Sequence, residues 1–324
     1  MFTNKDIEYK SIFVINCIEN RALRVSNGEL LLEELREGGK KTLTKLPFQK
    51  ILALFVIGHI TITTPLVEKC KKYNVAICVM KMNLRPVFFL SDSAEANYLL
   101  RQRQYELDNN DLSIARFLVK NKVMNQCKLL SNTRKKDELT IGALQYGNSI
   151  VDQINSVKNY EFLMGIEGNM AKKFFKAYFQ EMGWQTRAPR VKCDAINTTL
   201  DIGYTILFNY IEANVRMFGF DPYIGVYHRL WFKRKSLICD LMEPFRCVIE
   251  CRVRKSYNQG QFKESDFEVR KGEYHLKYDK SGEYYRLFYT ELIDRKKEIF
   301  GFIRSYYRCF MSGKKEMDYS YYNY

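Results

Sequence analysis

Hydrophobic and polar positions follow different patterns in the two parts of the chain. In roughly the first ninety residues, β-branched and apolar residues gather in the runs Ser11 to Cys17, Leu30 to Leu35 and Ile51 to Thr63. The pairs Asn27-Gly28 and Gly38-Gly39 are typical of tight turns between strands. This pattern predicts a β-rich N-terminal domain.

A short helix is expected near the end of that part. Thr64 has the residue type of an N-cap, Pro65 suits the first helical position, and Asn74 follows the last helical residue, Tyr73. The next segment, Val75 to Met80, has the composition of a strand. The strands are therefore expected to be followed by a strand-helix-strand closure.

Beyond the small, polar stretch Ser91 to Asn97 the pattern becomes helical. Apolar residues recur there at spacings of three and four. The segments concerned are Leu112 to Leu130, Met164 to Met182, Thr198 to Phe218 and Ser236 to Val248. We predict an α+β protein, with a β-rich domain at 1–92, a linker at 93–98 and an all-α domain at 99–324.

Two segments of the second domain lack this pattern. Gly260 to Gly282 is charged and weakly periodic, which indicates a surface loop. The tyrosine-rich end, Asp318 to Tyr324, is expected to form a flexible tail.

The composition is typical of a packed globular protein, with 46% hydrophobic and 15% aromatic residues. The longest uninterrupted apolar run, Ile51 to Ile57, is much shorter than the roughly 20 residues of a membrane helix, and Asp6 and Glu8 do not fit a signal peptide. Nine cysteines without a C-x-x-C pair are expected to be reduced and mostly buried. These features favour a soluble, cytoplasmic protein.

The charge of the chain points to a polyanionic partner. Fifty-two Lys and Arg residues against 37 Asp and Glu residues give a formal charge of +15, spread along the chain. Nucleic acid is the natural partner of such a surplus, whereas no segment combines the basic and broad apolar faces of a membrane-surface helix. A basic protein with a solvated surface remains the alternative.

Glu167 is the first candidate for chemistry. On a helical wheel it lies on the side of Met170, Phe174 and Tyr178. The lysines of the same segment lie on the opposite side: Lys172, Lys173 and Lys176. A carboxylate that faces a core needs an ion pair or a bound cation. The structural alternative is a first-turn glutamate that the helix dipole stabilises.

A second group of candidates follows later in the chain. His228 is one of three histidines, and Asp240 and Glu243 share one face of the next predicted helix. Adjacent carboxylates raise each other's pKa unless a cation relieves the repulsion. Pro244 within that helix costs about 3 kcal/mol, which indicates a local geometry kept for a reason. The alternatives are a structural histidine and a solvated acidic face.

One imidazole and two or three carboxylates form a mostly hard ligand set, which suits Mg²⁺ or Mn²⁺, and the histidine favours manganese. Zinc would more often recruit the cysteines. Such a cation neutralises a phosphate and activates a water or hydroxyl nucleophile. The residues therefore indicate chemistry on phosphodiesters.

The candidate residues lie in three motifs of the chain. They are Glu167-Gly168 with Ala171 and Lys172, then Gly219 to Gly225 with His228, and then Ser236 to Arg246 with Asp240 and Glu243. His228 lies 61 residues after Glu167 and 15 before Glu243. In order and spacing these motifs resemble the CRISPR-associated endonuclease and integrase family called Cas one, and weaker similarity extends over most of the chain.

By this resemblance, Glu167, His228 and Glu243 would bind a divalent metal, and Asp240 would support the site or bind DNA. The residues expected to hold DNA phosphates are Lys172, Lys173, Lys176, Arg187, Arg190, Lys192 and Arg246. The implied fold has an N-terminal β domain that mediates dimerisation and a helical catalytic domain.

The resemblance also implies an assembly and a reaction. Two homodimers would flank a dimer of the partner Cas two in a prokaryotic cytoplasm. The 3′-hydroxyl of a captured DNA fragment would attack a phosphodiester at a repeat boundary, so that double-stranded and branched DNA are the substrates of a transesterification.

Two alternatives stay open on the sequence. A structure-selective endonuclease would use the same residues with water as the nucleophile. A non-catalytic DNA-binding scaffold would carry the acidic residues on a solvated face, and its binding would weaken with salt by a slope of about −0.9 per phosphate contact.

Overall fold

The computed structural model describes residues 3–17, 20–91, 97–108, 110–184, 186–313 and 318–324. The chain divides into two compact units. One consists of Met1–Gln104 and Asn209–Asp221, and the other of Tyr105–Phe208 and Pro222–Tyr324.

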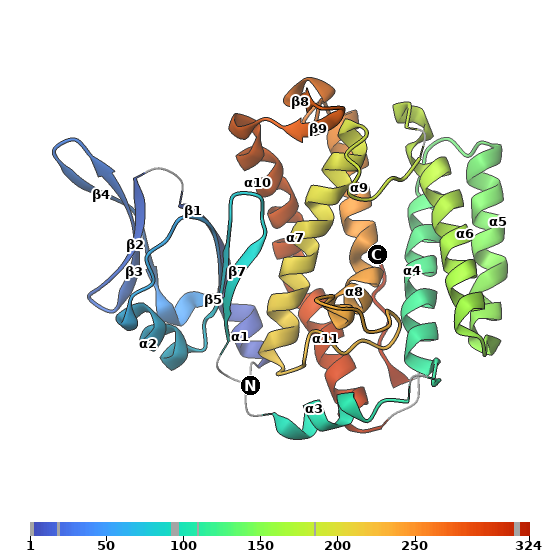
Figure 1. Ribbon diagram of the computed structural model, residues 1–324, viewed down its shortest axis with the longest axis horizontal. Helices are drawn as coiled ribbons and strands as arrows, with labels where there is room; N and C mark the ends of the chain where they lie inside the picture. Colours follow the sequence, from blue (N-terminus) through green and yellow to red (C-terminus); the bar gives the residue numbers. More distant parts are fainter. Residues whose placement is uncertain (1–2, 18–19, 92–96, 109, 185, 314–317) are drawn as a thin grey trace. The chain divides into compact units, whose positions relative to one another are not determined.

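The first unit contains two sheets (Figure 1). The larger has the strand order β1-β5-β6-β7, in which β5 pairs in parallel with β1 and β6, and β7 is antiparallel to β6. The smaller is the antiparallel meander β2-β3-β4. The strands are β1 (Ser11–Cys17), β2 (Arg21–Ser26), β3 (Glu29–Arg36), β4 (Gly39–Pro47), β5 (Ile51–Gly58), β6 (Ala76–Met80) and β7 (Pro86–Leu90). The helices are α1 (Asn4–Tyr9), η1 (Phe48–Lys50), α2 (Thr64–Tyr73) and, at the boundary, α3 (Tyr98–Tyr105).

Strand β5 forms the centre of the larger sheet. Its residues from Ile51 to Ile57 are all buried, as expected for a strand that is paired on both sides. At Gly58 the backbone has a φ of +112°, and a Cβ there would lie 2.4 Å from the carbonyl oxygen of Cys17. The strand therefore ends at Gly58, earlier than the predicted end at Thr63.

Turn and cap residues confirm the local predictions except at one position. Asn27 and Gly28, which join β2 to β3, have φ angles of 50° and 80°, as a tight hairpin with the twist of its strands requires. Helix α2 has Pro65 in its first turn and Asn74 in the left-handed conformation at its C-cap, as predicted, but it spans Thr64–Tyr73, so that Thr63 and not Thr64 is the N-cap. This helix forms the predicted closure between the parallel strands β5 and β6.

The end of helix α7 completes the first unit. The side-chain amide of Asn209 donates to the carbonyl of Leu84 at 2.8 Å, and the ring of Tyr210 stacks on Phe55 with centroids 5.7 Å apart. No sequence pattern indicates that residues 209–221 belong to this unit. The predicted linker at 93–98 falls mostly outside the described residues, so the linker stays a prediction.

The second unit is mainly helical, as predicted. Helices α4, α5 and α6 lie side by side in it (Figure 1). Its helices are α4 (Ser113–Ser131), α5 (Glu138–Gln153), α6 (Tyr160–Phe179), α7 (Ala195–Met217, whose end belongs to the first unit), α8 (Ser236–Met242), α9 (Arg246–Asn258), α10 (Tyr278–Asp294) and α11 (Lys296–Met311). Short 3₁₀ turns are η2 (Ile154–Ser156), η3 (Gln180–Met182), η4 (Glu243–Phe245) and η5 (Glu264–Asp266).

The segment expected to be a surface loop has regular structure. Within Gly260 to Gly282, strand β8 (Phe267–Arg270) pairs antiparallel with β9 (Glu273–Leu276). The turn between them has Lys271 and Gly272 at φ 51° and 81°. The loop prediction is wrong here, because charged residues on a short exposed hairpin hide its period.

The expectation of a flexible tail is also wrong. Tyr319 and Tyr322 are 4% and 5% exposed. The Tyr322 ring lies 4.4 Å from the ring of Phe245, and its carbonyl accepts hydrogen bonds from the side-chain amides of Asn121 and Asn125. Aromatic burial and paired backbone groups hold the chain end against α4, which sequence composition does not reveal.

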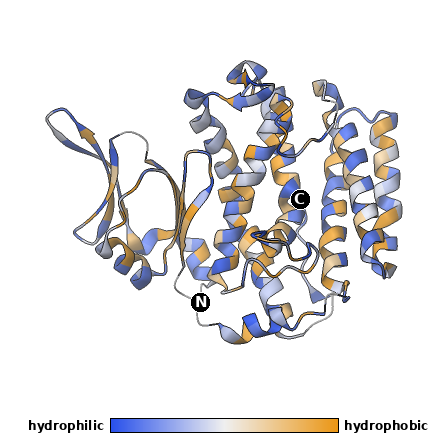
Figure 2. Cartoon of the chain, viewed as in Figure 1, coloured by the Kyte–Doolittle hydropathy of each residue, from blue (hydrophilic) through white to orange (hydrophobic). Residues whose placement is uncertain are grey.

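The hydropathy of the helices agrees with the predicted packing. Figure 2 shows hydrophilic residues along the long helices as well as hydrophobic ones. No helix within the described residues is long and apolar enough to span a membrane. All nine cysteines lie within the described residues and are free thiols, and only Cys193 among them is exposed, as predicted.

The packing of the tail predicts a loss of stability on Tyr322→Ala. We expect the free energy of unfolding to fall by about 3–5 kcal/mol, as for other large aromatic residues removed from a core. Urea unfolding followed by circular dichroism measures this change, with the exposed neighbour Asn323→Ala as a control. Equal stability of the two variants would show that the tail does not pack in solution.

Candidate functional site

Lys122 joins two of the predicted site residues. It lies in the middle of α4, and its side chain is only 9% exposed. Its ammonium donates to Glu167 of α6 and lies 2.6 Å from Oε2 of Glu243 in η4. Two carboxylates that are 76 residues apart in the sequence therefore share one buried cation.

The position of Glu167 decides between its two interpretations. Helix α6 begins at Tyr160, so that Glu167 lies two turns inside it, and the first-turn explanation is wrong. Its predicted neighbours Met170, Phe174 and Tyr178 are buried. The carboxylate faces the interior, as the helical wheel predicted, and has the ion pair that such a position needs.

Pro244 determines the backbone around Glu243. Helix α8 ends at Met242, and one 3₁₀ turn, Glu243–Phe245, separates it from α9. The predicted continuous helix is thus interrupted, because proline has no N–H for the helical hydrogen bond. Glu243 and Asp240 are 4% and 0% exposed, so the interpretation of a solvated acidic face is wrong.

Two cations lie on the buried carboxylate of Glu243. Nε of Arg246 is 2.9 Å from the same oxygen that Lys122 approaches. Burial alone would raise the pKa of Glu243, but Arg246, Lys122 and His228 together lower the pKa to about 2. The carboxylate is therefore ionised at neutral pH.

Asp240 fixes the position of His228. Its carboxylate accepts the backbone N–H groups of Val226, Tyr227 and His228 at 2.6, 3.1 and 2.8 Å. Its Oδ1 also lies 2.7 Å from Nδ1 of His228. With a proton on Nδ1 for this contact, the Nε2 atom of the imidazole is left to accept a proton or bind a ligand.

Gly225 makes this arrangement possible. A Cβ at this position would lie 2.5 Å from Oδ2 of Asp240 and 2.8 Å from Cβ of Ser236. Only a residue without a side chain lets the backbone come so close that three successive N–H groups reach one carboxylate.

The candidate site offers two carboxylates and one imidazole as donors for a divalent cation. Within the described residues, no three His, Cys, Asp or Glu side chains are close enough to hold a metal ion. The chemistry of the donors nevertheless fits, because Glu167 and Glu243 already share a cation and the imidazole of His228 is oriented by Asp240. A metal ion at this place would require the ammonium of Lys122 to release at least one carboxylate.

The basic residues predicted to hold DNA fall into two groups. Lys172, Lys173, Lys176 and Arg190 are exposed, whereas Arg187, Lys192 and Arg246 are engaged with acidic or polar groups of the chain. Exposed ammonium groups on α6 can reach a phosphate without breaking an ion pair.

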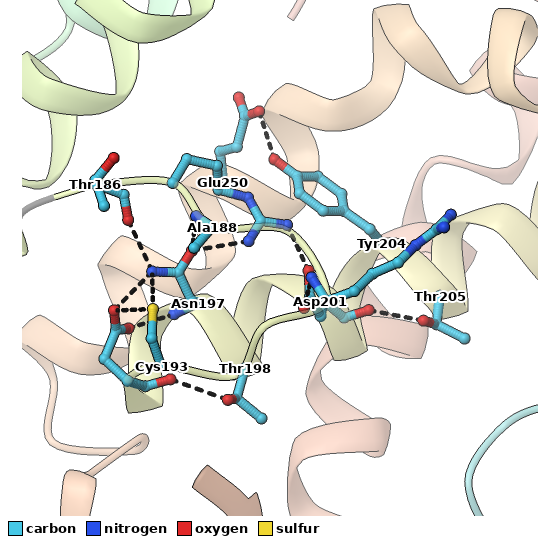
Figure 3. A network of polar contacts seen from close by, with 12 residues as sticks. Thr186, Ala188, Cys193, Asn197, Thr198, Asp201, Tyr204, Thr205 and Glu250 are labelled. Atoms are coloured by element: carbon cyan, nitrogen blue, oxygen red, sulfur yellow. Dashed lines mark hydrogen bonds and ion pairs between the residues drawn. The ribbon is translucent and has the colours of Figure 1, made fainter. Parts of the chain in front are cut away.

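Asn197 and Asp201 belong to a network of polar contacts (Figure 3). The guanidinium of Arg187 donates to the side chains of these two residues at 2.8 and 2.5 Å, and lies over the ring of Tyr204. Arg246 lies over the same ring, 4.7 Å from its centroid. Arg187 thus holds the segment before α7 in place, and its contact with DNA stays a prediction.

Three residues near the site escaped the sequence interpretation. Lys122 is one, and Tyr227 is another, with its ring 4% exposed beside the ring of His228. The third is Glu250, which accepts a hydrogen bond from Tyr204 at 2.7 Å, and burial raises the pKa of Glu250 to about 7. The sequence shows Lys122 only as one of several polar residues, such as Asn121 and Asn125, within the predicted helical segment Leu112 to Leu130, and the structure shows that all three are buried.

Comparisons with known proteins agree with the motifs. A sequence model of the family described as CRISPR associated protein Cas1 matches residues 17–290. A CRISPR-associated endonuclease Cas1 of Thermodesulfovibrio yellowstonii is 28% identical over 242 residues, which cover 71% of this chain and 75% of that protein.

Two solved structures share the fold. A casposase bound to integration product has a TM-score of 0.74 and 19% identity, and the match covers 94% of this chain and 91% of that one. A Cas6-RT-Cas1–Cas2 complex has a TM-score of 0.75 and 19% identity, and the match covers 97% of this chain and 36% of that one. Because the family model matches well over half of the sequence, the chain belongs to the Cas1 family of CRISPR-associated proteins.

Proposed function

We propose that this protein is an integrase of CRISPR adaptation, which joins short DNA fragments to a repeat array by transesterification in the presence of Mg²⁺ or Mn²⁺. The observation that carries the proposal is a pair of carboxylates, the partly buried Glu167 and the buried Glu243, that share a buried ammonium beside an oriented histidine. Membership of the Cas1 family and the fold shared with a casposase bound to integration product support it.

Each residue of the site has a proposed task. Glu167, Glu243 and Nε2 of His228 would hold the divalent cation, and Asp240 would position the imidazole without touching DNA, since it is fully buried. When bound, the cation would neutralise a phosphate and lower the pKa of an attacking hydroxyl.

Positively charged side chains of the chain would add to the effect of the cation on the DNA phosphates. Lys122 and Arg246 keep positive charge beside Glu243, which would stabilise the negative charge that develops on phosphate oxygens during displacement. The exposed lysines of α6, Lys172, Lys173 and Lys176, would hold the DNA backbone. No external energy source is needed, because one phosphodiester replaces another.

A proposal for the assembly of the protein comes from the related structures. We propose a homodimer formed through the first unit, bound to a Cas2 dimer, because a neighbour of this fold is part of a Cas1–Cas2 complex. Strand β7 is an edge strand, and its residues Val87 and Phe88 are 62% and 36% exposed. Apolar residues on an open edge favour pairing with another chain.

Strand transfer tests the proposed reaction. On a branched DNA with a free 3′-hydroxyl, we expect joined product with Mn²⁺ or Mg²⁺ but not with EDTA. His228→Ala should lower the rate by about 10²-fold or more, because it removes a ligand and a proton acceptor. His59→Ala, an exposed histidine of the first unit, is the control.

The other outcomes of this assay identify the alternatives. Cleavage without joining would make the protein a nuclease. Binding of DNA with no metal-dependent product, and no effect of His228→Ala, would make it a scaffold.

A second prediction concerns Lys122→Met. Without divalent ions we expect the variant to lose about 3–5 kcal/mol of stability, since the buried carboxylate of Glu243 and the partly buried carboxylate of Glu167 lose their shared partner. Mn²⁺ should then raise its melting temperature more than that of the unchanged chain, because the carboxylates no longer have a competing ammonium. Lys128→Met, an exposed position on the same helix, is the control. If Mn²⁺ raised the melting temperatures of Lys122→Met and of the unchanged chain equally, the ammonium and the metal would not share a position.

A third prediction concerns the dimer. Light scattering should give a dimer for the unchanged chain and a monomer for Val87→Lys, because a charge on the edge strand opposes pairing. Val191→Lys, at a valine of the second unit that is 57% exposed, should stay dimeric. A dimer for both variants would place the interface elsewhere.

A further inference from the structure

The loop that follows His228 exposes three consecutive apolar side chains. Leu230, Trp231 and Phe232 are 64%, 76% and 82% exposed. The other tryptophan of the chain, Trp184, is only 9% exposed and packs against Phe175. Exposed apolar clusters of this kind mark sites of interaction.

Hydrogen bonds and ion pairs hold the base of this loop, at His228 and Arg229. Asp240 binds the backbone at His228, and the hydroxyl of Ser236 donates to the carbonyl of Arg229 at 3.2 Å. The guanidinium of Arg229 lies over the ring of Tyr160, 4.0 Å from its centroid, and 3.7 Å from Glu161. These contacts connect the loop to the start of α6 and to the candidate site.

The tip itself is a tight turn. The N–H of Arg234 donates to the carbonyl of Trp231 at 2.9 Å, and Lys233 has a φ of 60°. The ammonium of Lys233 lies 5.0 Å from the centre of the Phe232 ring. The turn therefore leaves both aromatic side chains exposed to solvent.

The positive charge of the loop indicates which kind of partner it binds. Between His228 and Ser236 the sequence contains four cations and no acidic residue; the cations are Arg229, Lys233, Arg234 and Lys235. Aromatic rings among cations are the combination that binds single-stranded nucleic acid, because bases stack on the rings while the phosphates meet the charges.

We propose that Trp231 and Phe232 stack on unpaired bases of the DNA whose phosphate lies at the site. The proposal rests on DNA being the substrate of the site. Trp231 is three residues from His228, so that their Cα atoms lie at most about 11 Å apart, and the loop can reach bases only in the immediate neighbourhood of the reacting phosphate. The loop therefore favours DNA that is unpaired beside the reacting phosphate over a continuous duplex.

Binding in EDTA tests this without any catalysis. Two labelled DNAs with equal numbers of nucleotides are compared, one fully paired and one with an unpaired arm. Trp231→Ala with Phe232→Ala should weaken binding of the DNA with the unpaired arm by about 5- to 150-fold, the range of one stacked base, and leave the paired DNA nearly unchanged. Trp231→Phe with the native Phe232 should retain most of the preference.

A matched variant separates stacking from charge. Lys233→Gln should weaken both DNAs alike and lower the salt dependence, because a phosphate contact does not distinguish paired from unpaired bases. Fluorescence gives a second measurement. Trp231 emission should be quenched by the unpaired arm, and the quenching should disappear in Trp231→Phe, which keeps the buried Trp184. Unchanged melting temperatures would show that the loop variants fold.

Several results would overturn the proposal. Equal losses on both DNAs, or no loss on either, would remove the stacking role while leaving the proposed reaction intact. A change of oligomeric state in Trp231→Ala with Phe232→Ala would make the loop a protein contact. Failure of the unchanged chain to bind either DNA would instead contradict the proposed function itself.

Discussion

The ion pairs of Lys122 connect the elements on which the site depends. One buried ammonium joins α4 to α6 through Glu167 and to η4 through Glu243. Isolated charges are costly in a protein interior, and a buried pair becomes strongly unfavourable once one partner is removed. Two carboxylates facing each other could not be held there without a cation. The ion pairs of Lys122 therefore allow the chain to fold with Glu167 and Glu243 close together before a metal binds.

The same interaction limits how the site can work. A divalent cation and the ammonium of Lys122 compete for the same carboxylates, so metal affinity depends on how easily the lysine moves. Arg246 remains on Glu243 in either case and lies over the ring of Tyr204. Asp240 acts differently, because it holds His228 by the backbone and by Nδ1 at once. The histidine is thus fixed independently of the charge on the carboxylate pair.

Local sequence rules predicted much of the fold. The turn at Asn27-Gly28 and the helix from Thr64 to Tyr73 follow from residues with narrow backbone preferences. The tail and the segment 209–221 could not be predicted, because their positions depend on partners far along the chain. Tyr322 is held by Asn121, and Asn209 by Leu84.

In the candidate site, too, the sequence predicted some features and the structure was needed for others. Glu167, His228, Asp240 and Glu243 were predicted, and the structure brings Lys122 to two of them and Asp240 to His228. A helical wheel showed that Glu167 faces the core, but it could not show which cation compensates its charge. Pro244 was recognised as unusual, whereas the 3₁₀ turn that it causes required the structure. Long-range charge compensation is therefore the part that sequence patterns do not contain.

Diffraction from crystals soaked with Mn²⁺, measured at a wavelength where manganese scatters anomalously, would show whether the metal and the ammonium of Lys122 compete for the carboxylates. We expect one strong anomalous peak bounded by Glu167, Glu243 and Nε2 of His228, with the ammonium of Lys122 moved away from at least one carboxylate. Lys122 still bound to both carboxylates, with manganese absent from the site or bound elsewhere, would contradict this competition.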